Sequence, residues 1–140
     1  MTDILVAADD PRVFEEIRSV VEDSSTILRW VKRGEDVRES MNYQPADLVI
    51  ADMQIDTMGG IAVAFDLELE ADAGRLETRP LLLLLDRRAD VFMARRSGIK
   101  GWLVKPIDPL RLRRATAALL AGGTWYDESY LPSPVLIPVN

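Results

Sequence analysis

The chain has 140 residues, the size of one ordinary domain, and its 17 basic and 23 acidic side chains give a formal charge of −6. This acidic balance argues against general binding to nucleic acids. The chain contains no cysteine and no histidine, which excludes disulfides, thiolate or imidazole metal sites and catalytic pairs that need histidine. No apolar stretch approaches the ~20 residues of a membrane span and the N-terminus lacks signal-peptide features, so we expect a cytoplasmic protein.

Five short apolar runs predict the β-strands of the chain. The first, at residues 4–8, is continuously apolar, which is typical of a strand buried on both faces of a sheet. The second, at 26–31, is β-branched and aromatic and is expected nearer an edge. Three further runs, at 48–51, 81–85 and 101–104, complete the set.

Helical segments separate these runs. Pro11 opens the first helix, whose apolar side chains recur with helical spacing as far as Val21. Asp108 and Pro109 combine an N-cap with a proline at the first helical position of the last helix. The expected helices are 11–21, 35–41, 61–71, 91–96 and 109–121. Strands that alternate with helices indicate a parallel sheet with helices on both of its faces.

Charged side chains directly follow three of the predicted strands. Asp9 and Asp10 come after the first strand, Asp52 after the third and Lys105 after the fifth. Because the carboxyl ends of parallel strands meet at one edge of a sheet, where open α/β folds bind ligands, we expect these side chains to lie together. Neighbouring carboxylates repel one another unless a cation neutralises them, and Mg²⁺ prefers oxygen ligands. The sequence therefore predicts a magnesium site beside a carboxylate that could accept a phosphoryl group.

Residues 122–140 differ in composition from residues 1–121, which we take as the domain. Prolines at 132, 134 and 138 disfavour a regular helix or a central strand. The segment is nevertheless too apolar for a solvated linker. We expect a proline- and aromatic-rich tail that packs on the domain, with a partner-binding or exchanged segment as the alternative.

Several separated motifs carry a family pattern. They are LVAADD at 5–10, DLVIAD at 47–52, MGG at 58–60, SG at 97–98 and WLVKP at 102–106. Over residues 4–120 the chain resembles the receiver domain of bacterial two-component response regulators. The resemblance implies a flavodoxin-like (βα)5 fold, a three-layer α/β sandwich with a central five-stranded parallel sheet. It also implies a cis peptide bond between Lys105 and Pro106.

The resemblance implies a role for each site residue. Asp52 is the phospho-acceptor, which takes a phosphoryl group from a sensor histidine kinase or a small phosphodonor, and Lys105 pairs with Asp52 and then with a phosphoryl oxygen. Mg²⁺ is bound by Asp10, Asp52 and the backbone carbonyl of Gln54, with Asp9 assisting through metal-bound water. Such a protein is not an enzyme, because at most it catalyses its own phosphorylation and dephosphorylation.

Some positions depart from the family pattern. The family usually ends its fourth strand with serine or threonine, and here this switch position falls on Leu85, with Asp86 as the other candidate. Neither side chain has a hydroxyl group, and Asp86 would repel a phosphorylated Asp52 unless it faced elsewhere. Trp102 stands where the family has a signalling aromatic, although a tryptophan can also serve packing alone. We therefore expect an atypical receiver without the usual switch from hydroxyl to aromatic residue.

The second half of the chain is basic. Residues 86–121 contain nine basic and three acidic side chains, a balance of +6. In receiver folds this section forms the output and dimerisation face, so we expect an acidic partner or a homodimer there. An ordinary solvated surface is the alternative. No DNA-binding domain follows, so a stand-alone receiver that signals by protein–protein contact, without direct DNA or membrane binding, is expected.

Three other functions are alternatives to a phosphorylated receiver. A pseudo-receiver that binds a partner independently of phosphate is the main alternative, because the family hydroxyl is missing. An aspartyl phosphatase would need a second aspartate two residues after Asp52, where the chain has Gln54. A flavin carrier would need a loop rich in serine, threonine and glycine after the first strand, and residues 9–12 do not provide one.

Overall fold

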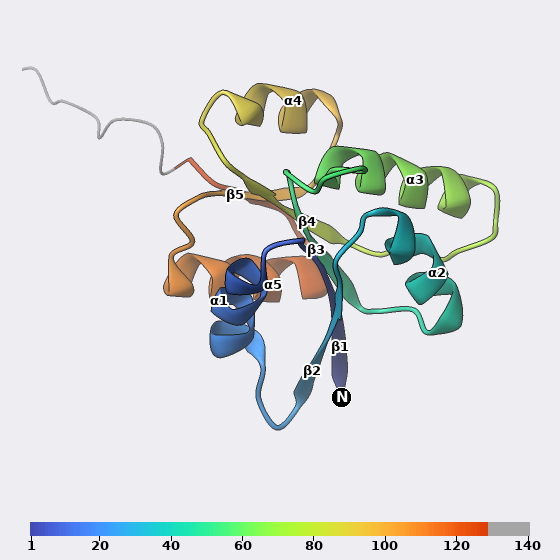
Figure 1. Cartoon of the computed structure of the whole chain (residues 1–140), viewed down its shortest axis with the longest axis horizontal. Coiled ribbons are helices and arrows are strands. Elements are labelled where there is room, and N and C mark those ends of the chain that lie inside the picture. Colours follow the sequence, from blue (N-terminus) through green and yellow to red (C-terminus); the bar gives the residue numbers. More distant parts are fainter. Residues whose placement is uncertain (129–140) are drawn as a thin grey trace, which may run out of the picture.

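The sheet of the protein has six parallel strands. In the computed structural model, which describes residues 1–128, the strand order is β2-β1-β3-β4-β5-β6 (Figure 1). The strands are β1 Thr2–Ala7, β2 Thr26–Val31, β3 Leu48–Asp52, β4 Leu81–Leu85, β5 Gly101–Val104 and β6 Trp125–Tyr126. The α/β fold with a parallel sheet that the sequence predicts is confirmed, and β2 lies at the edge of the sheet as expected.

Five helices cover the two faces of the sheet. They are α1 Pro11–Val21, α2 Glu35–Tyr43, α3 Gly60–Asp72, α4 Asp90–Arg96 and α5 Pro109–Leu120. Helices α1 and α5 lie together on one face, and α2, α3 and α4 lie on the other (Figure 1). No helix within residues 1–128 is long and apolar enough to cross a membrane.

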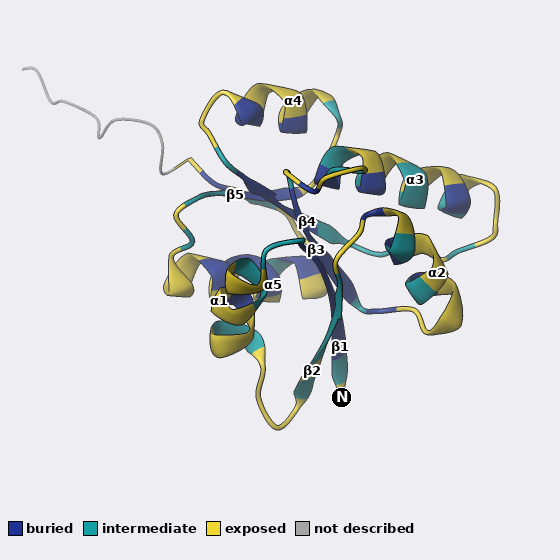
Figure 2. Cartoon of the chain, in the orientation of Figure 1, coloured by how far each residue is buried: buried dark blue, intermediate teal, exposed yellow. Residues whose placement is uncertain are grey.

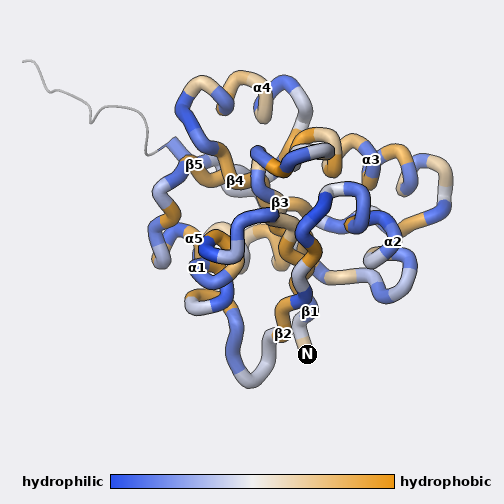
Figure 3. Tube along the Cα trace, viewed as in Figure 1, coloured by the Kyte–Doolittle hydropathy of each residue, from blue (hydrophilic) through white to orange (hydrophobic). Residues whose placement is uncertain are grey.

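The strands are buried because their side chains point alternately to the two faces of the sheet, and each face is covered by a hydrophobic core. Ile4 and Val6 of β1 face α1 and α5, whereas Leu5 and Ala7 face α2 and α3. This explains why the central strands read as continuous apolar runs. Figure 2 shows the central strands as the most buried part of the chain, and Figure 3 shows the hydrophobic residues gathered around them. The rigid sheet holds the strand ends that carry the charged side chains.

Two helices begin at aspartate N-caps, and the one at Asp108 is the N-cap that the sequence predicts. The Asp10 side chain accepts a hydrogen bond from the backbone N–H of Arg12, and the Asp108 side chain accepts one from Arg111. In both helices a proline follows the cap, where its missing N–H costs nothing. The bond between Lys105 and Pro106 is cis, as the resemblance implies.

The sixth strand corrects the prediction of a five-stranded sheet. Trp125 donates its backbone N–H to the carbonyl of Lys100, and Asp127 donates its own to the carbonyl of Trp102. A two-residue strand has no periodicity that a sequence pattern could reveal, and the prolines of the tail all lie beyond it. The rest of the predicted tail, 129–140, lies outside the described residues.

Truncation of a core side chain should lower the free energy of unfolding by a predictable amount. Leu84 is fully buried between the sheet and the helices α1 and α5. We expect Leu84→Ala to lower the free energy of unfolding by about 3 kcal/mol, because lost burial and a cavity add together. The matched change Leu69→Ala, at a side chain that is 65% exposed, should alter it by less than about 0.5 kcal/mol. Urea denaturation measures both, and equal effects would contradict this assignment of the core.

Candidate functional site

The register of the sheet gathers the charged side chains. Asp52 at the end of β3 pairs with Leu84 of β4, and Leu85 pairs with Val104 of β5. Lys105 follows Val104 by one residue, so it lies at the same edge of the sheet as Asp52. Strand β4 separates the strands that carry Asp52 and Lys105. The lysine must therefore reach across the end of β4 to contact the aspartate.

Lys105 contacts two carboxylates at this edge. Its Nζ donates to Oδ1 of Asp52 at 2.8 Å and to Oδ1 of Asp86 at 2.9 Å. Asp52 is only 3% exposed, and its Oδ1 also accepts the backbone N–H of Gln54 at 3.3 Å. Both hydrogen bonds found for Asp52 within residues 1–128 thus go to Oδ1, and Oδ2 is the oxygen open to a new bond.

Burial and pairing shift the titration of both groups. Burial raises the pKa of Asp52 above the ordinary value, although Lys105 opposes the shift and the negative charge of Asp86 adds to it. Burial alone would lower the pKa of Lys105, but its hydrogen bonds to Asp52 and Asp86 outweigh that effect and raise it. Lys105 therefore stays an ammonium ion at neutral pH. A buried carboxylate next to a fixed cation is a common feature of functional sites.

The two acids after β1 lie in different surroundings. Asp10 caps helix α1 and forms an ion pair with Arg12 at 3.0 Å, and these hydrogen bonds hold the pKa of Asp10 below its ordinary value. Asp9 instead faces the loop after β3, where its Oδ2 accepts the backbone N–H of Asp56 at 3.2 Å. The structure thus places Asp9 against the loop after β3, whereas Asp10 pairs with Arg12 and lies close enough to Lys105 for the positive charge of that lysine to help lower the pKa of Asp10.

The carboxylates near Asp52 can be compared with the ligands that the predicted magnesium site needs. Within residues 1–128 no group of three or more carboxylates is close enough to hold a metal ion. Asp52 ends β3, and Asp9 follows the end of the adjacent strand β1 by two residues, since Ala7 of β1 pairs with Ala51 of β3. Mg²⁺ usually keeps several waters and takes only one or two carboxylates, together with substrate phosphates. Two carboxylates and the carbonyl of Gln54 fit this donor set.

A pair of glycines lets helix α3 start directly against the site. A Cβ atom on Gly60 would lie 2.6 Å from the carbonyl oxygen of Asp52, and one on Gly59 would lie 2.5 Å from that of Met53. Both distances are too short for a real contact, so a larger residue would displace the end of β3. The two glycines therefore maintain the position of Asp52.

The predicted switch positions are occupied by packed side chains. Leu85 is fully buried and packs with Val91 and Ala94 of α4. Trp102 is 1% exposed, with Arg95 5.3 Å above its ring and Tyr126 4.6 Å away between ring centroids. Asp86, by contrast, faces the site through Lys105.

The basic section of the chain forms a shallow depression next to Lys105. It is lined by Asp86, Arg87, Arg88, Val104, Lys105, Pro106, Asp108 and Arg111. Arg111 contacts Asp108 and Asp127 only at 3.9 and 3.8 Å, longer than a hydrogen bond. Part of the predicted basic face thus lies beside the Asp52 site itself.

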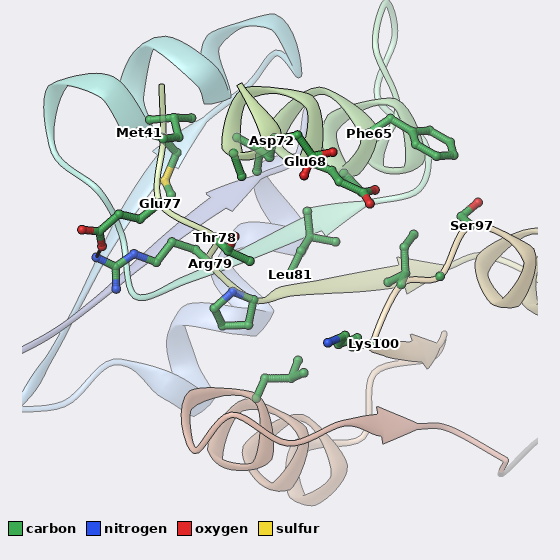
Figure 4. A pocket seen from close by; sticks show the side chains of 18 of the residues that line it. Met41, Phe65, Glu68, Asp72, Glu77, Thr78, Arg79, Leu81, Ser97 and Lys100 are labelled. Carbon is green, nitrogen blue, oxygen red and sulfur yellow. Dashed lines mark hydrogen bonds and ion pairs between the residues drawn. The ribbon is translucent and has the colours of Figure 1, made fainter. Parts of the chain in front are cut away.

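An apolar groove of 420 Å³ lies at the opposite edge of the sheet. Figure 4 shows Phe65 and Glu68 of α3 on one side of it, with Leu81 at the start of β4 and Ser97 before β5. These residues lie at the amino ends of the strands, whereas Asp52 lies at a carboxyl end. The groove is therefore separate from the chemistry at Asp52.

The comparison with known families agrees with this geometry. Residues 4–117 match the family model described as the response regulator receiver domain. The chain belongs to this family. Receiver domains are signalling modules of two-component phosphorelay systems, and they interact with histidine kinases and output domains.

Individual relatives support the assignment. The chain is 31% identical over 114 residues to a 14.6 kDa protein from the sodA1 3′ region of Leptolyngbya boryana, covering 80% of this chain and 85% of that one. It is 23% identical over 124 residues to PilH of Pseudomonas aeruginosa, covering 87% of this chain and all of PilH.

Solved structures share the fold at low identity. The receiver domain of a signal transduction histidine kinase from Syntrophus aciditrophicus has a TM-score of 0.77 at 24% identity, over 97% of this chain and 98% of that one. A response regulator from Chloroflexus aurantiacus has a TM-score of 0.76 at 20% identity, over 86% and 98%.

The sequence does not indicate one contact of the site, since Asp86 is expected only as a source of repulsion. The metal-binding role of Asp10 stays a prediction. The direct bond from Lys105 to Asp86 follows from the strand order, which the alternation of elements alone does not specify. The pairing of Asp10 had a local signal, since an aspartate before a proline that opens a helix is a typical N-cap.

The shifted pKa of Asp52 is directly measurable. In a ¹³C NMR titration of the side-chain carboxyl, we expect a midpoint above 3.8 and a still higher one in Lys105→Met, because the mutation removes the stabilising cation. Lys100→Met, at an exposed lysine on the opposite edge, should leave it unchanged.

The same shift makes stability depend on pH. Because the folded pKa exceeds the unfolded one, the folded state holds the Asp52 proton between the two values. The contribution of Asp52 to the free energy of unfolding should therefore fall as pH rises through that window, and denaturation of wild type and Asp52→Asn in parallel isolates it. A midpoint at or below 3.8 would contradict this description of the site.

Proposed function

We propose that the protein is a phosphorelay receiver that accepts a phosphoryl group on Asp52 and signals by protein–protein contact. The observation that supports this most directly is the 2.8 Å hydrogen bond between Lys105 and the buried Asp52. The phosphoryl group comes from the phosphohistidine of a sensor kinase or from a small phosphodonor.

Phosphoryl transfer to Asp52 depends on the positive charges around it. The free oxygen of Asp52 attacks the phosphorus, and negative charge spreads over the oxygens of the transferring group. Lys105 lies where its ammonium can bond one of these oxygens, which stabilises the transition state more than the ground state. Asp10, Asp52 and the carbonyl of Gln54 would hold Mg²⁺, which supplies further positive charge, and Asp9 would assist through metal-bound water. Asp10 would first give up its contact with Arg12.

The basic depression beside Lys105 is the surface that we assign to partners. Arg87 and Arg111 come from the loop after β4 and from α5, and both are largely exposed. An acidic segment of a kinase or an output protein fits this charge, and so does a second copy that offers its acidic surface. We expect the interaction to weaken as the salt concentration rises.

A pseudo-receiver that binds its partner without phosphorylation is the second candidate. It is favoured by one observation, the buried Leu85 at the position of the family hydroxyl. Such a protein would keep the same partner surface, but its partner affinity would not respond to a change at Asp52.

Intact-mass analysis tests the proposal. After incubation with Mg²⁺ and acetyl phosphate, we expect wild type to gain the mass of one phosphoryl group and Asp52→Asn to gain none. Asp47→Asn, at a half-buried aspartate that lies before β3 and so at the opposite end of that strand from Asp52, serves as the matched control and should behave as wild type. A folded wild type that gains no mass with saturating Mg²⁺ would favour the pseudo-receiver.

A further inference from the structure

Asp86 lies between the two charged partners of the site. It directly follows β4, the strand between β3 with Asp52 and β5 with Lys105. Because Leu85 pairs with Val104, the next residues along the two strands are Asp86 and Lys105. The lysine therefore meets the Asp86 carboxylate on its way to Asp52.

This carboxylate competes for the same ammonium group. The Nζ–Oδ1 distances from Lys105 to Asp52 and to Asp86 differ by only 0.1 Å, being 2.8 and 2.9 Å. The other oxygen of Asp86, Oδ2, is buried and has no hydrogen-bond partner among residues 1–128. Asp86 thus brings a full negative charge to the edge where an incoming phosphoryl group would arrive.

We infer that Asp86 is a positioning residue that restrains phosphoryl transfer to Asp52, an inference that rests on the function proposed above. It does so in two ways. It occupies Lys105, which must release it to bind a phosphoryl oxygen, and its charge opposes the approach of an anionic donor. The structure thus explains why an acid beside the acceptor is compatible with the fold: in the resting site it is neutralised by Lys105.

Phosphoryl transfer to Asp52 forms one oxygen–phosphorus bond and breaks another. With acetyl phosphate, Asp52 forms an oxygen–phosphorus bond while the phosphorus–oxygen bond to acetate breaks, and acetate leaves with the electron pair. No proton is transferred. The attacking carboxylate, the donor and Asp86 are all anionic, so removal of the Asp86 charge should favour the transition state.

The experiment compares Asp86→Asn, Asp86→Ala and Asp72→Asn with wild type. Asp72→Asn is the matched control, because it removes the same charge from an exposed residue at the end of α3, at the opposite edge of the sheet from Lys105. Initial phosphorylation rates with acetyl phosphate and Mg²⁺ are measured by intact mass, and circular dichroism verifies the fold. Binding of beryllium fluoride with Mg²⁺ gives a second readout that needs no transfer.

We expect both Asp86 variants to be phosphorylated about tenfold faster, a modest fraction of the interaction between charges ~4 Å apart near a protein surface. They should also bind beryllium fluoride more tightly, whereas Asp72→Asn should match wild type. If the Asp86 variants equal wild type or react more slowly, or if Asp72→Asn gains as much, the inference is wrong and the proposed function stands.

Two further outcomes separate the inference from the proposed function. If wild type is not phosphorylated but the folded Asp86 variants are, the restraint is real and the native chain is a silent receiver. If neither reacts and neither binds beryllium fluoride, both the inference and the proposed function fail.

Discussion

The position of Lys105 between two carboxylates is the constraint on which the site depends. A lysine at the end of β5 reaches Asp52 only by crossing the end of β4, and Asp86 is the residue that stands there. One ammonium thereby neutralises one of two acids, and the cluster retains a negative charge that a divalent cation would offset. The pKa of Asp52 is raised for the same reason, because the effects of burial and of the negative charge of Asp86 together exceed the opposing effect of Lys105.

The packing around this edge explains why the receiver is atypical. Gly59 and Gly60 bring α3 against the end of β3 and so hold Asp52 in place. Of the two predicted switch positions, Leu85 packs in the core under α4, and Asp86, one residue later, is the polar side chain at the end of β4. A carboxylate offers Lys105 an acceptor, but it cannot donate a hydrogen bond to a phosphoryl group while ionised.

The sequence carries most of the fold and only part of the site. The apolar runs and the capped helices locate five strands and five helices, because burial on both faces and N-cap chemistry leave local signals. The position of Asp52 and Lys105 follows from their place after strands. Two features need the folded chain: the bond from Lys105 to Asp86, which depends on strand order, and β6, which is too short to have a period.

The sixth strand connects the site to the C-terminal segment. The side chain of Asp127 is buried and accepts the backbone N–H of Val104 at 2.9 Å, one residue before Lys105. Tyr126 lies against the buried Trp102, so β6 contacts β5 through side chains as well as through backbone hydrogen bonds. In this receiver the edge of β5, left open by the five-stranded sheet that the sequence predicts, is already occupied by the chain's own segment.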